Sequence, residues 1–184
     1  CKINMFLHSV FNADIKKGDT IRDPKHLKGG ELMTFDRVIA NPPFSLDKWG
    51  KDEADNDGYG RFKYGTPPKG TGDLAFVQHM ISSLNADGVM GVVVPHGVLF
   101  RGSSEKSIRK GMLEDDLIEA VIGLPAGLFY GTGIPAALII INKSKSKERK
   151  NKIIFINSEL EYLEGKNQNK LTEENILHIL NTFD

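Results

Sequence analysis

Phe35-Asp36-Arg37-Val38-Ile39-Ala40-Asn41-Pro42-Pro43-Phe44 joins an apolar run to two consecutive prolines, and this pattern predicts a β-strand that ends abruptly. Proline has no backbone N–H group, so Pro42 and Pro43 cannot continue a hydrogen-bonded ladder. Each proline also disfavours the helical conformation of the preceding residue, which keeps Asn41 extended at the end of the strand. Ligands of open α/β sheets bind beyond the carboxyl ends of the strands, so we expect Asn41 to lie on that functional rim.

The rest of the chain alternates amphipathic segments with short apolar runs. Apolar residues spaced three and four apart predict helices, and short apolar runs predict buried strands. The expected helices cover residues 3–11, 73–84, 103–113 and 172–180, and the expected strands cover residues 13–21, 35–40, 89–94, 117–122, 136–141 and 153–156. Strands that alternate with helices up to residue 122 indicate an α/β domain with a mostly parallel sheet. The last two apolar runs follow each other closely, so we expect an antiparallel hairpin near one edge of the sheet.

The segment between residues 45 and 72 is polar and rich in glycine, proline and aspartate, so we expect an extended loop. Loops of this length inside a compact domain are usually functional or mobile. Beyond the loop, Asp73 is placed to cap the next helix and Thr172 to cap the last one. Asn175 stands where glutamate or glutamine completes a capping box, so we expect the last helix to begin just after Thr172.

The composition fits one globular domain of ordinary size. The 184 residues are 40% hydrophobic and 26% charged, which is enough apolar material for a core. We expect no membrane segment and no signal peptide, because no apolar run approaches roughly 20 residues and the first residues lack a leader pattern. The single cysteine, Cys1, excludes an internal disulfide and fits a reducing cytoplasm. The five histidines do not cluster at ligand spacing, so we expect no metal site.

The formal net charge is zero, so the chain has no overall electrostatic signature of a nucleic-acid-binding protein. A DNA enzyme of this composition needs a local basic patch, or a partner that supplies most of the phosphate contacts. Arg61, Lys63 and Lys69 are interleaved with aromatic residues in the polar loop and form the candidate patch. The alternative is a solvated loop that does not contact DNA.

Asn41-Pro42-Pro43-Phe44 also carries the groups needed to act on an aromatic amine. The side-chain oxygen of Asn41 and the backbone carbonyl of Pro42 can converge on one amino group. An exocyclic amine on a purine is a poor nucleophile because its lone pair is delocalised, and two acceptors favour a pyramidal nitrogen that can attack an activated methyl group. Phe44 offers a platform for a base that has left the duplex, and such stacking contributes roughly 1–3 kcal/mol. The alternative is that the motif only terminates a strand.

This motif and several further segments resemble one protein family. Ile39-Ala40-Asn41-Pro42-Pro43-Phe44-Ser45 resembles the catalytic motif of amino-methyltransferases that use S-adenosylmethionine. Nearly the whole chain resembles the modification subunit of type I restriction–modification systems, which is an N6-adenine-specific DNA methyltransferase. The other matching segments are Gly18-Asp19-Thr20, Arg61-Phe62-Lys63-Tyr64-Gly65, Pro95-His96-Gly97-Val98-Leu99-Phe100-Arg101, Leu128-Phe129-Tyr130-Gly131-Thr132-Gly133-Ile134-Pro135 and Gly165-Lys166-Asn167-Gln168-Asn169.

The resemblance implies a Rossmann-like, S-adenosylmethionine-dependent methyltransferase fold that methylates adenine at its exocyclic amine within a bipartite DNA sequence. It implies that Asn41-Pro42-Pro43-Phe44 holds the target adenine and that Asp19 contacts the adenine moiety of the methyl donor. It also implies that Phe129 or Tyr130 packs against the flipped base from the other side. Structural alternatives stay open for two of these assignments, because Asp19 is also typical of a turn and Leu128-Phe129-Tyr130 of a core segment.

His96 has a structural and a functional interpretation too. It follows an expected buried strand at Pro95, which could place it on the rim of the sheet. We expect a hydrogen-bonded structural histidine instead, so it is not among the candidate catalytic residues.

The family's glycine-rich donor-binding loop and first strand are expected before Cys1. We therefore interpret residues 1–184 as a single domain, the C-terminal portion of a methyltransferase catalytic domain. The resemblance implies as partners double-stranded DNA, the specificity and restriction subunits of the same system and a second modification subunit. Two other interpretations remain open, namely methylation of a protein glutamine or an RNA base, and a non-catalytic scaffold that docks to a specificity subunit. Relatives of the first kind more often carry tyrosine where Phe44 stands.

Overall fold

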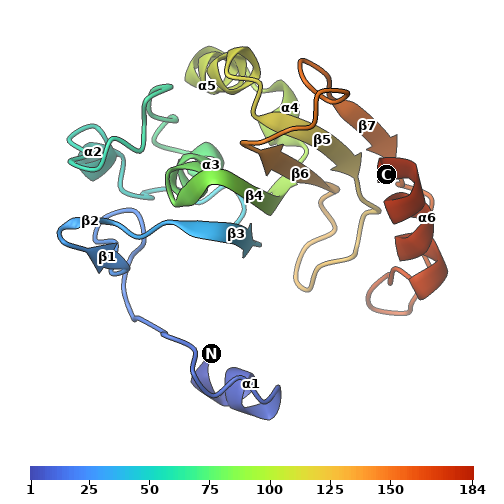
Figure 1. Cartoon of the computed structure of the whole chain (residues 1–184). Coiled ribbons are helices and arrows are strands. Elements are labelled where there is room, and N and C mark those ends of the chain that lie inside the picture. Colours follow the sequence, from blue (N-terminus) through green and yellow to red (C-terminus); the bar gives the residue numbers. More distant parts are fainter.

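The computed structural model describes all of residues 1–184 and centres on a five-stranded sheet (Figure 1). Across the sheet the strands are β3 (Phe35–Ala40), β4 (Leu84–Pro95), β6 (Ala136–Asn142), β5 (Ile118–Gly123) and β7 (Ile154–Asn157). The pair β3–β4 and the pair β5–β7 are parallel, whereas β6 is antiparallel to both of its neighbours. Four strands therefore run in one direction and one runs against them, which confirms an α/β fold with a mostly parallel sheet.

The antiparallel strand lies inside the sheet rather than at its edge. The hairpin expected between residues 136–141 and 153–156 is wrong, because β6 pairs with β4 and β5 while β7 pairs in parallel with β5. The physical reason is the apolar character of both strands. Residues 89–94 of β4 and residues 136–141 of β6 are apolar throughout, and a central place in the sheet covers such strands better than an edge does.

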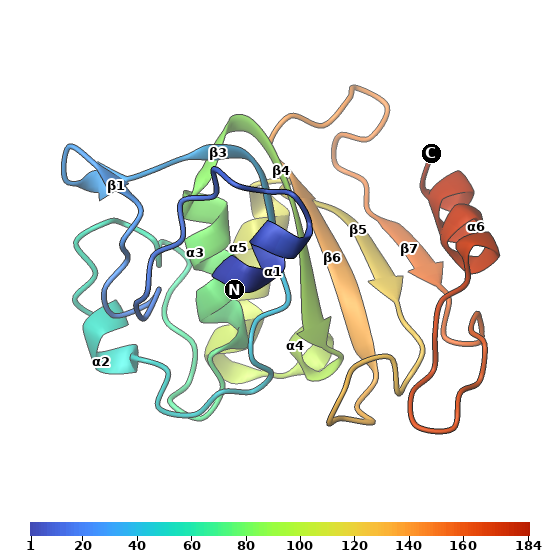
Figure 2. The same ribbon diagram turned by 90° about the horizontal axis from the view of Figure 1, so that it is seen from below.

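Three helices cover one face of the sheet, and Figure 2 shows two of them, α3 and α5, behind the strands. These helices are α3 (Asp73–Ser82), α4 (Gly97–Phe100) and α5 (Ser103–Glu114). The main core lies between them and the sheet, where Leu74 and Val77 of α3 belong to the same buried cluster as Val92 and Ile139. This packing holds the carboxyl ends of β3 and β4 against the start of α3 and α4.

The opposite face is only partly covered. The last helix, α6 (Glu173–Phe183), packs there over β5 and β7, with Ile179 in a cluster that includes Ile122 and Ile156. Toward β3 the same face is open, and Ile39 is 86% exposed. The capping box of α6 is confirmed, because Thr172 Oγ1 accepts from the Asn175 N–H at 3.2 Å and Asn175 Oδ1 accepts from the Thr172 N–H at 2.9 Å.

The N-terminal region differs from the expectation in two ways. The first helix, α1 (Lys2–Leu7), is shorter than residues 3–11, and Figure 1 shows it apart from the sheet at the end of an extended segment. Residues 13–21 form no strand. A short hairpin of β1 (Leu27–Lys28) and β2 (Glu31–Leu32) follows instead, turning at two glycines with φ of +62° and +89°. Consecutive positive φ values are those of a type I′ turn, which glycine adopts without strain.

The long polar segment between residues 45 and 72 is folded onto the body. It contains a short helix, α2 (Lys51–Ala54), and its Trp49 is 1% exposed. Trp49 Nε1 donates to the Pro68 carbonyl at 2.9 Å, and a Cβ at Gly72 would lie 2.6 Å from Trp49 Cγ. The loop is therefore packed around a buried indole. None of the helices in this fold combines the length and the apolar character needed to span a bilayer.

Candidate active site

The carboxyl end of β3 opens onto a pocket of about 350 Å³. Asn41, Pro42 and Phe44 line one side of it, and the connection between β5 and β6 lines the other. The lining residues are Asn41, Pro42, Phe44, Phe129, Tyr130, Thr132 and Ile134. Two segments almost ninety residues apart in the sequence thus meet at one rim, and they are the two segments expected to hold the target base.

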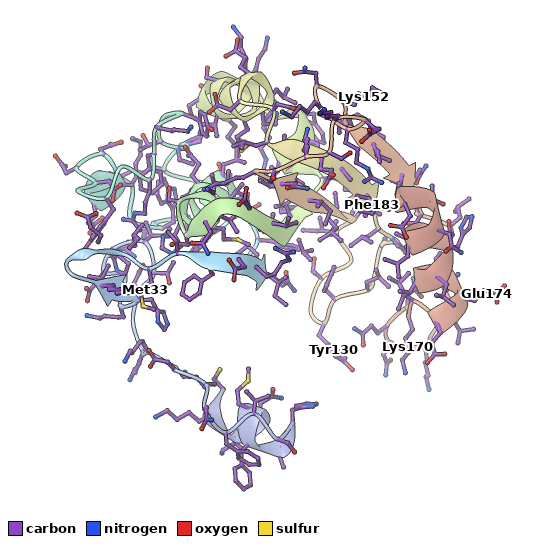
Figure 3. The ribbon with its side chains drawn as sticks, viewed as in Figure 1. Met33, Tyr130, Lys152, Lys170, Glu174 and Phe183 are labelled. Atoms are coloured by element: carbon purple, nitrogen blue, oxygen red, sulfur yellow. The ribbon has the colours of Figure 1, made fainter.

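Phe44 and Phe129 both line this pocket, and their rings contact each other. Their ring centroids are 6.1 Å apart and the rings meet edge to face at 78°. Both side chains are half-buried, whereas Tyr130 is 87% exposed and points outward near the tip of its loop (Figure 3). Of the two residues expected opposite Phe44, Phe129 therefore has the geometry of a second aromatic wall.

The polar atoms of the motif are free for a ligand. The side chain of Asn41 makes no hydrogen bond within the protein, and neither does the carbonyl oxygen of Pro42. The two prolines fix φ on either side of this carbonyl, so the backbone here is rigid and should move little when a ligand binds. No histidine or carboxylate lines the pocket. The site thus offers two acceptors and two aromatic faces, with no general base.

A polar cluster built around the buried Asp73 carboxylate lies directly behind the motif. Ser45 has a left-handed backbone with φ of +48°, and its N–H donates to Asp73 Oδ1 at 2.7 Å. Arg101 reaches Asp73 Oδ2 with Nη1 at 2.8 Å and Ser45 Oγ with Nη2 at 3.0 Å. The expected helix cap at Asp73 is wrong, because Gly72 occupies the cap position and the Asp73 carboxylate is used here.

Sequence reasoning missed this cluster because its contacts join residues that are 28 and 56 positions apart. The one available signal was Arg101 itself, which ends a segment that resembles the methyltransferase family. A charged residue close after a buried strand usually needs a partner, because an unpaired buried charge is costly.

Asp19 takes part in a turn. Its Oδ1 accepts from the N–H groups of Ile21 and Arg22, both at 3.0 Å, and its Oδ2 accepts from Arg22 Nη1 at 2.6 Å. Partial burial alone would raise the pKa of Asp19, but the hydrogen bonds from Arg22 and Ile21 outweigh it and lower the pKa. The side chain is 44% exposed, so an ionised carboxylate remains open to solvent on one side. A contact with the methyl donor stays a prediction.

Arg61 requires a correction. It was expected to contact DNA, but the structure buries it to 3% exposure. Its guanidinium pairs with Asp57 at 2.8 Å and donates to the carbonyls of Thr20 at 3.0 Å and Ile21 at 2.8 Å. Because every polar direction is used inside the protein, Arg61 fastens the polar loop to the turn at Asp19 and does not reach a phosphate.

Lys63 and Lys69 lie at the surface and remain candidates for DNA contact. Lys63 Nζ is 2.6 Å from Asp115 Oδ2, and its side chain is 57% exposed. The hydrogen bond to Asp115, followed by the one to Tyr64, raises the pKa of Lys63, so it stays cationic. Lys69 is 71% exposed and lies 3.4 Å from Asp52. The local basic character of this loop therefore depends on lysines that are also paired with carboxylates.

The two histidines near the rim and the loop are structural. His96 Nε2 lies 2.9 Å from the Ala136 carbonyl, which confirms a hydrogen-bonded histidine next to the pocket loop. His79 Nδ1 lies 3.2 Å from Arg61 Nη1. Burial, followed by the nearby Arg61 charge, lowers the pKa of His79 to about 4. No three histidine, cysteine or acidic side chains come together in a group that could hold a metal ion.

An α/β sheet whose strand mouth carries Asn41 and Pro42 beside two aromatic rings is compatible with an amino-methyltransferase type of domain. The family model described as N-6 DNA Methylase matches residues 1–184. The methylase subunit of the MjaVII type I restriction enzyme of Methanocaldococcus jannaschii is 41% identical over 194 residues, which cover 100% of this chain and 33% of the relative. The chain therefore belongs to the N-6 DNA methylase family.

Solved structures show the same fold. A methyltransferase subunit of a type I restriction–modification system from Streptococcus thermophilus superposes with a TM-score of 0.87 at 38% identity, covering 98% of this chain and 38% of that one. The M protein of the type I restriction enzyme EcoKI superposes with a TM-score of 0.66 at 24% identity, covering 95% of this chain and 36% of that one, and this likeness shows the fold alone. The chain spans about a third of the length of the curated relatives that it matches.

Proposed function

We propose that this chain is the catalytic part of a DNA adenine methyltransferase subunit in a type I restriction–modification complex. One observation carries the proposal: Asn41 and Pro42, whose side-chain and carbonyl oxygens have no partner in the protein, line one pocket with Phe44 and Phe129. Family membership supports methyl transfer to DNA, and the pocket supports a planar base bearing an amino group as the acceptor.

The residues of the pocket perform three tasks. Asn41 Oδ1 and the Pro42 carbonyl accept the two N–H groups of the adenine amine, which favours a pyramidal nitrogen with an available lone pair. Phe44 and Phe129 present aromatic faces to the extruded base, and stacking of this kind offsets part of the unstacking cost. After transfer, the extra proton on nitrogen leaves to water, since the amine becomes strongly acidic once it carries a fourth bond and no side chain at the pocket is needed to remove it.

The methyl donor in this proposal is S-adenosylmethionine, which supplies a methyl group bound to a sulfonium sulfur. Asp19 is compatible with this methyl donor, because its carboxylate is ionised and partly exposed. Its Oδ2 also keeps an acceptor position beyond the hydrogen bond from Arg22. Asp19 would accept a hydrogen bond from the donor's adenine moiety.

The proposed partners follow from the same assignment. They are double-stranded DNA, the specificity and restriction subunits of the same system and a second modification subunit, all in the cytoplasm. The zero net charge supports a complex in which other subunits make most of the phosphate contacts. DNA affinity depends on neutralised phosphates, and this chain has no excess of basic residues. Lys63 and Lys69 contribute locally, and the specificity subunit supplies most of the contacts and the sequence recognition.

The test is the variant Asn41→Ala in the complete gene product that contains residues 1–184. Loss of one of two preorganised acceptors should lower the rate of adenine methylation at least about a hundredfold, equivalent to roughly 2.7–4 kcal/mol in comparable polar sites. Affinity for the methyl donor should stay within about twofold.

Asn85→Ala is the matched control. Its side-chain amide donates to Asp36 at 2.6 Å at the opposite end of β3, so methylation should be unchanged. Near-normal methylation by Asn41→Ala would show that the motif is structural. Methylation of RNA or protein in place of DNA, or binding to the specificity subunit without any methylation, would contradict the proposed function.

A further inference from the structure

The cluster behind the pocket contains more buried charge than a strand end requires. Asp73 is 1% exposed and Glu105 is 2% exposed, and both carboxylates face the guanidinium of Arg101. Arg101 Nη1 lies 2.8 Å from Asp73 and 3.4 Å from Glu105. Burial raises the pKa of the Glu105 carboxyl, and the nearby Arg101 opposes this rise. Buried charges of this kind are costly unless they are paired, and a well-packed apolar cluster would be about as stable.

The cluster is connected to the pocket through one residue. Ser45 directly follows Phe44, and its φ of +48° lies in a region that non-glycine residues rarely adopt. Its N–H is held by Asp73 and its Oγ by Arg101. Strained backbone of this kind persists only where the surroundings over-determine it. Two contacts from the cluster thus hold Ser45, the residue directly after Phe44, whose ring contacts that of Phe129.

The position of Arg101 is itself set by close packing. A Cβ on Gly97 would lie 2.6 Å from Arg101 Nε and 2.7 Å from Nη2, so any larger residue there would force the guanidinium to shift. On the far side, Arg109 donates to the Arg101 carbonyl at 2.6 Å and to the Val98 carbonyl at 3.0 Å. The side chain and the backbone of Arg101 are therefore both held from separate elements.

We propose that Arg101, paired with Asp73, is a positioning residue that fixes Ser45 and so places Phe44 and the amine-binding oxygens for capture of the target base. The inference rests on the proposed function and deepens it. Arg101 touches neither base nor donor and acts through Ser45. Asp73 supplies the charge that holds the guanidinium and the acceptor that holds the Ser45 N–H.

The test compares Arg101→Gln, Arg101→Lys and Gly97→Ala with wild type in the complete gene product and the complex that it forms. The first removes the charge, the second keeps the charge without the forked geometry, and the third displaces an intact guanidinium. Arg101→Gln and Gly97→Ala should lower kcat on the order of a hundredfold, as expected for a small misplacement of a reacting group. Arg101→Lys should recover part of the loss, while KM for DNA should stay within about twofold in all three.

Lys145→Gln is the matched control. Lys145 forms a buried ion pair with Asp116 at 2.6 Å beyond the opposite end of β6, so it reports the cost of losing a buried charge without touching the rim. It should lower the melting temperature and leave kcat unchanged. Equal kcat losses in Lys145→Gln and Arg101→Gln, or wild-type kcat in both Arg101→Gln and Gly97→Ala, would overturn the proposal.

A second readout separates this inference from the proposed function. Fluorine-labelled phenylalanine at position 44 reports the ring position without any substrate. A single resonance in wild type and in Lys145→Gln should become shifted or split in Arg101→Gln and Gly97→Ala. If wild type fails to methylate adenine, the proposed function fails while the fluorine spectra still decide whether Arg101 positions Phe44. Unchanged spectra in both variants would overturn the positioning role.

Discussion

Arg61 and Lys63 are two positions apart in the sequence, but their replacement by alanine should affect stability differently. Arg61→Ala should destabilise the protein, whereas Lys63→Ala should have little effect. The Arg61 and Asp57 side chains are 2% and 6% exposed, so Arg61→Ala leaves a buried carboxylate without its partner. Breaking a buried ion pair in this way costs about 3–5 kcal/mol. The carbonyls of Thr20 and Ile21 also lose their donors, which keeps the loss toward the upper end of that range.

Lys63→Ala removes an exposed pair with Asp115, which contributes less than about 1 kcal/mol. The assay is hydrogen exchange of the complete gene product, read on peptides that span residues 19–23 and 57–61. Arg61→Ala should lower protection there by the local free energy lost, whereas Lys63→Ala should not. The comparison also needs DNA binding measured at several salt concentrations. Loss of a phosphate contact reduces the slope of log affinity against log salt concentration by about one.

Two results would refute the reasoning on Arg61. One is Arg61→Ala protein whose exchange protection stays within about 0.5 kcal/mol of wild type, as is usual for a surface substitution. The other is a salt slope reduced by about one for Arg61→Ala without local opening, which would return Arg61 to the DNA interface. The double variant Arg61→Met with Asp57→Leu removes both charges together, and it should be more stable than Arg61→Ala alone.

Three further predictions concern separate parts of the molecule. Phe44→Ala should weaken base capture by about 1–3 kcal/mol. The loss in methylation should shrink when the target adenine faces a mismatch, since an unpaired base is easier to extrude. A uniform loss of methylation that tracks a lowered melting temperature would argue against stacking. The pKa of His79 in the folded protein is about 4, below its ordinary value of 6.5. Between these pH values the unfolded chain binds more protons, so stability that is present above pH 6.5 is lost as the pH falls toward 4. The loss should reach about 3 kcal/mol, from roughly 1.4 kcal/mol per pH unit, in pH-dependent unfolding curves that His79→Gln flattens. Gly111→Ala places a carbon 2.4 Å from the Tyr64 ring and should destabilise the domain by about 1–3 kcal/mol in a thermal melt, and an unchanged melting temperature would show that the ring moves freely.

The parts of the fold that followed from the sequence were those with a local signal. The two prolines after Ala40 were enough to place Asn41 at a strand mouth, and Asn175 after Thr172 was enough to place the start of α6. The double glycine at 29–30 is a comparable local signal for the β1–β2 hairpin. Local chemistry of this kind acts within a few residues and needs no knowledge of the fold.

What the sequence could not provide were contacts between distant segments. Arg61 looked like a surface residue because its loop is polar, and its carbonyl partners at 20 and 21 lie about forty residues away. The central place of β6 depends on which strand buries most apolar surface, and that is a property of the whole sheet. The family resemblance indicated Phe129 or Tyr130 on the side opposite Phe44, and the structure shows Phe129 in edge-to-face contact with Phe44.

The central claim is that Asn41 and Pro42 hold the exocyclic amine of adenine for methyl transfer. The most direct measurement is nucleoside mass spectrometry of unmethylated DNA treated with the complete gene product, in the complex that it forms, and a methyl donor carrying deuterium. The account predicts that N6-methyldeoxyadenosine is the labelled product with wild type and is lost with Asn41→Ala. Label on cytosine, or equal amounts of labelled N6-methyldeoxyadenosine from wild type and Asn41→Ala, would contradict it.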